Sequence, residues 1–121
     1  MRLFIADDSQ ILRSRLFEMI SEIEGVKIVG EAESVPAAVG AIEKLRPDVV
    51  VLDIRMPGGD VIEVLGSLKK GKNPPLVIIF TNYPYLQYRK RCLDVGADFF
   101  FYKATEFERL IDLLRQLTQT A

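Results

Sequence analysis

Five polar residues in this sequence stand at the ends of four short apolar runs, and their types suit phosphoryl transfer. They are Asp7, Asp8, Asp53, Thr81 and Lys103. Carboxylates hold hard divalent cations, while a hydroxyl and an ammonium group can neutralise phosphoryl oxygens during an in-line transfer. If the five side chains lie together, the sequence therefore predicts a metal-assisted phosphoryl site.

The metal preference follows from the ligands that this chain offers. Three clustered carboxylates repel one another and stay ionised only when a cation or hydrogen bonds offset the repulsion. The sequence has no His, and Cys92 is its single cysteine. An all-oxygen site of this kind favours Mg²⁺, with Mn²⁺ as the expected substitute.

Asp53 is the candidate nucleophile. It ends the apolar run Val49–Leu52, and the loop after it contains Pro57-Gly58. Attack by an aspartate on phosphorus would form an acyl phosphate, whose oxygens Thr81 and Lys103 would bind. A lone aspartate after a strand is more often a cap or a turn residue, so the hypothesis rests on all five residues together.

The elements that must position these residues form a repeating pattern of short apolar runs and amphipathic stretches. Runs at consecutive apolar positions indicate strands that are covered on both faces, as in a parallel sheet. Five such units predict a doubly wound α/β fold, whose ligand site lies at the carboxyl ends of the strands. The predicted strands are Leu3–Ala6, Val26–Glu31, Val49–Leu52, Leu76–Phe80 and Phe99–Tyr102.

The helices between these strands carry recognisable start signals. Ser9, Ser34 and Asp60 are expected near the starts of the first three helices. The fourth should follow Pro84 and bury a stripe of Tyr85, Tyr88, Cys92 and Val95. The fifth is predicted to begin with a capping box of Thr105 and Glu108 and to bury Phe107, Leu110, Ile111, Leu114 and Leu117.

Composition excludes several other functions. The 121 residues suffice for one domain, and a formal net charge of −1 leaves no broad basic surface for nucleic acid. Imidazole relays, Cys/His zinc sites and internal disulfides are excluded, and Cys92 is expected to be a buried core residue. Without a signal peptide or an apolar run of roughly 20 residues, we expect no membrane association and a cytoplasmic location.

With its motifs in place, the chain resembles the receiver domain of bacterial response regulators, in particular the single-domain receivers similar to the chemotaxis regulator. The resemblance spans almost the whole chain and rests on Asp7-Asp8, the Val-Val-Val-Leu-Asp53-Ile-Arg-Met-Pro-Gly stretch, Thr81 and the Gly96-Ala97-Asp98 to Lys103 stretch. It implies a flavodoxin-like (βα)5 fold with strand order 2-1-3-4-5. It also implies phosphorylation of Asp53 and Mg²⁺ held by Asp7, Asp8, Asp53 and the backbone carbonyl of Arg55.

The resemblance further implies a switch, in which Thr81 and the aromatic residue three positions before Lys103 move on phosphorylation. That aromatic is Phe100, where the family commonly has Tyr, so a hydroxyl is missing here. Ala104 stands where many receivers have proline, which predicts a differently shaped loop. Arg55 and Tyr83 occupy positions that border the path of the hydrolytic water in receivers.

The partners expected on this basis are a sensor histidine kinase or a phosphotransfer protein, and a downstream protein bound by the fourth helix, fifth strand and fifth helix. Residues 1–121 are expected to form one receiver domain without an output domain, and a homodimer formed on phosphorylation is left open. Two alternatives remain. One is a phosphorylation-independent interaction module, and the other is an aspartyl-nucleophile phosphohydrolase, which usually needs a second acid where Arg55 stands.

Overall fold

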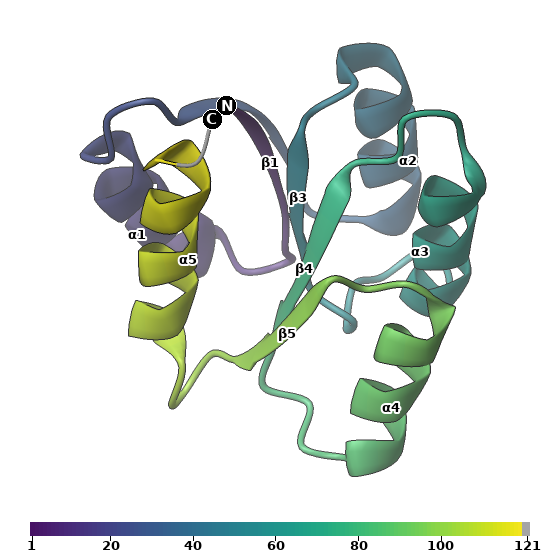
Figure 1. Ribbon diagram of the computed structural model, residues 1–121. Coiled ribbons are helices and arrows are strands. Elements are labelled where there is room, and N and C mark those ends of the chain that lie inside the picture. Colours follow the sequence, from purple (N-terminus) through teal and green to yellow (C-terminus); the bar gives the residue numbers. More distant parts are fainter. Residues whose placement is uncertain (120–121) are drawn as a thin grey trace.

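The computed structural model describes residues 1–119, which form one parallel five-stranded sheet flanked by helices (Figure 1). The strand order β2-β1-β3-β4-β5 confirms the predicted topology, with β2 at an edge. Each strand lies within one or two residues of its predicted bounds. The strands are β1 (Arg2–Ala6), β2 (Lys27–Ala32), β3 (Val49–Leu52), β4 (Leu76–Thr81) and β5 (Phe99–Tyr102).

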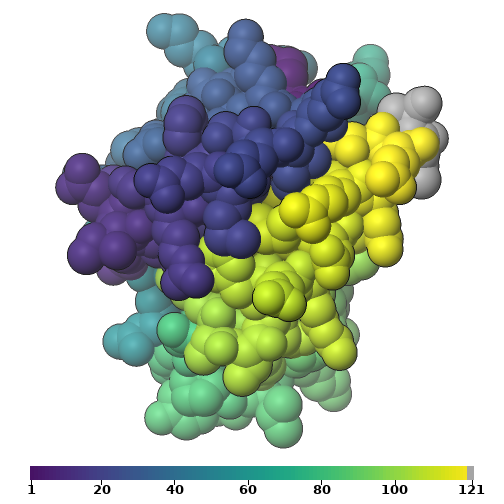
Figure 2. All heavy atoms as spheres, turned by 90° about the vertical axis from the view of Figure 1, so that its left-hand side faces the viewer, coloured from purple at the N-terminus to yellow at the C-terminus, as the bar shows by residue number. Residues whose placement is uncertain are grey.

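Helices cover both faces of the sheet. Figure 1 shows α1 and α5 on one face and α2, α3 and α4 on the other, as right-handed crossovers require. Viewed from the side of α1 and α5, the two helices lie next to each other across the surface (Figure 2). The helices are α1 (Gln10–Ser21), α2 (Val35–Leu45), α3 (Val61–Lys70), α4 (Leu86–Val95) and α5 (Phe107–Gln119).

Two separate hydrophobic clusters hold these layers together, because successive strand residues point to opposite faces. Phe4, Leu52 and Ile79 belong to the cluster under α2, α3 and α4. Ile5 and Phe80 belong to the cluster under α1 and α5. The central strand β3 is buried along its whole length, so its backbone is held rigidly and fixes the position of Asp53, which follows it.

The first three helices begin as their capping residues predict. Ser9, Ser34 and Asp60 are the N-caps of α1, α2 and α3, and each side chain accepts a hydrogen bond from a backbone N–H of the first turn. Gly96 ends α4 with a φ of 129°, a backbone angle that a side chain would disfavour. No helix within residues 1–119 combines the length and the apolar character needed to cross a bilayer.

Two helix predictions were wrong in part. Within the stripe expected for α4, Cys92 is fully buried, but Tyr85 is 52% exposed because it precedes the helix, and Val95 is 38% exposed. The capping box expected at α5 is not formed. That helix begins at Phe107, and Glu106 instead accepts a hydrogen bond from the backbone N–H of Tyr102.

The burial of Cys92 leads to a test of the packing under α4. Burial raises the pKa of its thiol to about 11, so almost no reactive thiolate exists near neutral pH. We expect the native protein to resist Ellman's reagent at pH 8, whereas the same protein in guanidinium should release one equivalent of the chromophore. Rapid modification of the native protein would show that the helix does not cover the thiol.

Candidate functional site

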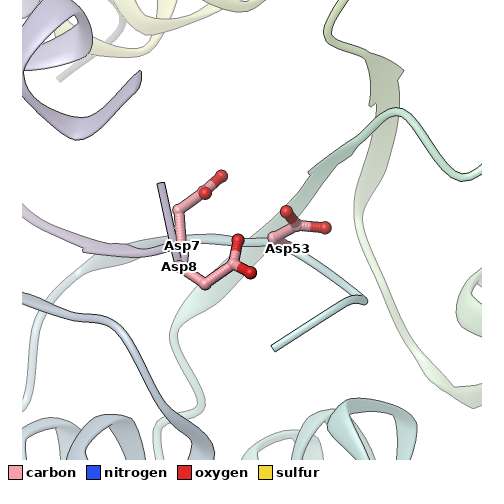
Figure 3. Close-up of side chains that lie close together, drawn as sticks. All are labelled: Asp7, Asp8 and Asp53. Carbon is pink, nitrogen blue, oxygen red and sulfur yellow. The ribbon is translucent and has the colours of Figure 1, made fainter. Parts of the chain in front are cut away.

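The carboxylates of Asp7, Asp8 and Asp53 meet at the carboxyl ends of β1 and β3 (Figure 3). One oxygen from each side chain lies within 4.8 Å of the others. Asp7 and Asp53 are 3% and 4% exposed, whereas Asp8 lies at the surface. Their placement follows from the sheet, since the backbone N–H of Asp53 bonds to the carbonyl of Ala6 across the β1–β3 pair at 3.0 Å.

Lys103 reaches into this cluster from the end of β5. Its Nζ lies 2.6 Å from Oδ2 of Asp7 and 2.7 Å from Oδ2 of Asp53, so one ammonium pairs with both buried carboxylates. The backbone N–H of Lys103 donates to the carbonyl of Thr81 at 2.9 Å. The strand pairing between β4 and β5 therefore fixes the point from which the lysine extends.

Thr81 contacts the other oxygen of Asp53. Its hydroxyl donates to Oδ1 of Asp53 at 2.7 Å, and the same Oδ1 accepts a bond from the backbone N–H of Arg55 at 3.1 Å. The Thr81 hydroxyl in turn accepts a bond from the backbone N–H of Tyr83 at 3.2 Å. All five side chains singled out from the sequence thus lie at one rim.

The electrostatics of the rim reflect its burial. Burial raises the pKa of Asp7 above its ordinary value, against the lowering effect of its hydrogen bonds from Lys103 and the backbone N–H of Ser9. Burial alone would lower the pKa of Lys103, but the hydrogen bonds to Asp53 and Asp7 outweigh it and raise that pKa. Three carboxylates against one ammonium leave an excess of negative charge, which a divalent cation fits.

An open hollow of about 560 Å³ gives access to this rim and is lined by Asp8, Asp53, Thr81 and Lys103. Arg55 and Tyr83 also line the hollow, with the Arg55 guanidinium carbon 5.1 Å from the centre of the Tyr83 ring. The hollow is large enough to admit a phosphoryl group between the lysine, the hydroxyl and the carboxylates.

The loop after Lys103 shows what Ala104 contributes in place of proline. The backbone N–H of Ala104 donates to Oδ1 of Asn82 at 2.9 Å, a bond that proline cannot make. This bond ties the loop after β5 to the loop after β4. Sequence reasoning did not identify Asn82, since nothing in its spacing indicates a partner 22 residues away.

Phe100 points into the core under α4 and is 4% exposed. The Arg89 guanidinium lies 5.4 Å from the centre of its ring and 5.9 Å from that of Tyr102. Contacts of this kind are attractive by roughly 0.5 to 2 kcal/mol. Part of the basic stretch Arg89-Lys90-Arg91 thus packs on aromatic rings.

These observations define a doubly wound α/β domain with an acidic rim and a lysine at the carboxyl ends of its strands. The family profile of the response regulator receiver domain matches residues 3–115 of the chain. The chain therefore belongs to the receiver domain family of response regulators, the signalling domains of two-component systems. As a class, receiver domains bind Mg²⁺ in an acidic pocket and interact with histidine kinases and effectors.

Individual relatives agree with this assignment. The sensory transduction protein LytT of Bacillus cereus is 31% identical over 116 residues, which cover 96% of this chain and 46% of that protein. The response regulator domain of Thermotoga maritima CheB has a TM-score of 0.84 at 29% identity, covering 100% of this chain and 95% of that one. A LuxR-family DNA-binding response regulator from Staphylococcus aureus has a TM-score of 0.87 at 28% identity, covering 97% and 98%. The chain spans about half the length of several curated relatives that it matches.

The shared pairing of Lys103 predicts how much the rim depends on it. Lys103→Met removes the ammonium and leaves two buried carboxylates without their common partner, so we expect the free energy of unfolding to fall by about 3 kcal/mol without added metal. Urea denaturation followed by circular dichroism measures this change. Lys90→Met, at an exposed position of α4, is the control and should stay within about 0.5 kcal/mol of the parent. Equal stability of the two variants would contradict the proposed charge balance.

Proposed function

We propose that this domain accepts a phosphoryl group on Asp53 in the presence of Mg²⁺ and signals through the resulting change of its surface. The observation that carries the proposal is the convergence of Thr81 and Lys103 on the two carboxylate oxygens of Asp53, at 2.7 Å each. The proposed donor is the phosphohistidine of a sensor histidine kinase or phosphotransfer protein, or a small acyl phosphate. The proposed compartment is the cytoplasm, where a free thiol such as Cys92 stays reduced.

In the proposed reaction, a carboxylate oxygen of Asp53 attacks phosphorus and forms an acyl phosphate. The bond from phosphorus to the donor nitrogen breaks, and the imidazole leaves with the electron pair and takes up a proton. Lys103 and Thr81 already contact Asp53, so small side-chain movements bring their donors onto the transferred oxygens. Catalysis in such a transfer is chiefly positioning and charge neutralisation.

The proposed cation site is formed by residues that offer oxygen ligands. Asp7, Asp8, Asp53 and the backbone carbonyl of Arg55 would hold Mg²⁺, or Mn²⁺ in its place. When bound, the ion neutralises negative charge on the phosphoryl oxygens. Asp7 and Asp53 contribute buried carboxylates, and Asp8 contributes one that faces the solvent, from which the ion enters.

A mass measurement tests the acceptor and the metal requirement together. After incubation with acetyl phosphate and Mg²⁺, the parent chain should gain about 80 Da, the mass of one phosphoryl group. Asp53→Ala should gain nothing, and the parent treated with a chelator should gain little. Equal modification of Asp53→Ala would remove Asp53 as the acceptor. No modification of the folded parent would favour the phosphorylation-independent interaction module.

Arg55 and Tyr83 should control how long the phosphorylated form lasts. Their side chains contact each other and line the hollow that contains Asp53. In the proposed role, their bulk restricts the approach of water to the acyl phosphate. We expect Arg55→Ala and Tyr83→Ala each to shorten the lifetime of the acyl phosphate, as followed by the decay of the mass gain after removal of the donor. Arg91→Ala, an exposed arginine of α4, is the matched control. Parent-like decay in both rim variants would exclude this role.

The proposed output is a repacking of the side formed by α4, β5 and α5, to which a downstream protein binds. Phosphorylation would draw Thr81 toward the phosphoryl oxygens and stabilise the inward position that Phe100 already has. The stretch Arg89-Lys90-Arg91 would take part in docking. The contact of Arg89 with the rings of Phe100 and Tyr102 supports this proposal. It links the basic stretch to the switch residue Phe100, and this link does not need the hydroxyl that a tyrosine would supply. Association of two phosphorylated copies remains an alternative use of the same surface.

A further inference from the structure

Arg13 is a buried cation that the proposed chemistry does not use. Among residues 1–119 the buried polar or charged side chains are Asp7, Arg13, Asp53 and Thr81, and Arg13 alone is not one of the predicted rim residues. It lies on α1 and is 7% exposed. Burying a guanidinium is unfavourable unless its N–H groups have hydrogen-bond or ion-pair partners. The contacts of Arg13 therefore show what its burial achieves.

Those contacts tie the acidic loop to the edge strand. Nη1 of Arg13 donates to the backbone carbonyl of Asp7 at 2.5 Å, and Nε donates to Oε1 of Glu31 on β2 at 3.0 Å. Nη2 lies 3.9 Å from a carboxylate oxygen of Glu33. The two glutamates balance the positive charge of Arg13. The hydrogen bond to the carbonyl of Asp7 therefore serves mainly to fix the position of that carbonyl.

The carbonyl that Arg13 binds belongs to the peptide bond between Asp7 and Asp8. Because a peptide unit is planar, fixing this oxygen fixes the direction in which the chain enters Asp8. The N–H on the other side of Asp7 is also held, by the carbonyl of Ala32 at 3.0 Å. Asp7 is thus clamped to β2 through its N–H and to α1 through its carbonyl.

Asp8 has no such support from its own side chain. Within residues 1–119 its carboxylate makes no hydrogen bond or ion pair with the protein, and it lies exposed beside Asp7 and Asp53. Its position therefore depends on the backbone that leads to it. Ser9, which follows, is held by its N–H bond to Oδ1 of Asp7 at 2.9 Å.

We propose that Arg13 is a positioning residue for the metal site, which holds the Asp7–Asp8 peptide so that the Asp8 carboxylate stays at the rim. Glu31 orients the guanidinium for this contact. The inference rests on the proposed function, in that Asp8 is taken as a metal ligand. None of the Arg13 contacts involves Asp53, Thr81 or Lys103, so Arg13 should affect cation binding and not the acceptor.

The test measures Mg²⁺ binding to the folded, unphosphorylated chain by calorimetry. Arg13→Met should bind Mg²⁺ about 10-fold more weakly than the parent, the lower end of the effect of removing groups that orient metal ligands. Arg13→Lys keeps the charge but lacks the fork that spans Asp7 and Glu31, so it should fall between the two. Arg115→Met, which removes an exposed i,i+3 pair of α5, should bind like the parent.

Kinetics separate positioning from general damage. At saturating Mg²⁺ and acetyl phosphate, Arg13→Met should be phosphorylated at a rate within about twofold of the parent, while the Mg²⁺ concentration for half the maximal rate rises about 10-fold. A merely structural role would lower the unfolding temperature and leave the Mg²⁺ affinity of the folded chain unchanged. That result in Arg13→Met would overturn the inference.

Two further measurements keep the outcome decisive. If Arg13→Met does not fold, Glu31→Ala loosens the same guanidinium from the edge strand and should weaken Mg²⁺ binding, and parent-like affinity would overturn the inference. If the parent itself binds no Mg²⁺, the proposed metal site fails, and the metal-free amide spectrum still decides the role of Arg13. Replacement of Arg13 should then shift the amide resonances of Asp8 and Ser9 more than that of Lys103, and unchanged Asp8 and Ser9 resonances would overturn it.

Discussion

The concentration of negative charge at one end of the sheet is the constraint on which the rest of this structure depends. Asp7 and Asp53 are almost completely buried and share a single ammonium, that of Lys103. Carboxylates in such surroundings stay ionised only when charge and hydrogen bonds replace the lost water. Lys103 balances the negative charge of the three carboxylates only in part, and the proposed divalent cation would supply the missing positive charge.

The parallel sheet makes this arrangement achievable in a small domain. Strand pairing places the ends of β1, β3, β4 and β5 at one edge, and the two hydrophobic clusters hold those strands rigidly from both faces. Residues from positions 7 to 103 are thereby brought within hydrogen-bond distance without any local sequence signal linking them. Rigid support suits a site that works by positioning charged groups.

The rim could be predicted from the sequence because a local pattern and a general rule for parallel sheets together determine it. Continuous apolar runs identified the strands, and a general rule for parallel sheets placed Asp53 and Lys103 at the same edge. Arg13 and Asn82 were not predicted, because their roles depend on backbone atoms that only the folded chain brings near them. Tyr85 was misplaced because an apolar side chain at helical spacing says nothing about where the helix begins.

The loop that follows β4 connects the rim to the loop after β5 and to α4. Thr81 accepts a bond from the backbone N–H of Tyr83, and Asn82 between them accepts the bond from Ala104. The rings of Tyr83 and Tyr88 pack edge to face at 4.7 Å, which ties this loop to α4. Displacement of the Thr81 hydroxyl from Asp53 would therefore disturb its hydrogen bond with the backbone N–H of Tyr83, whose ring contacts α4. A change of charge at Asp53 thus has a short covalent and hydrogen-bonded route to the surface proposed for partner binding.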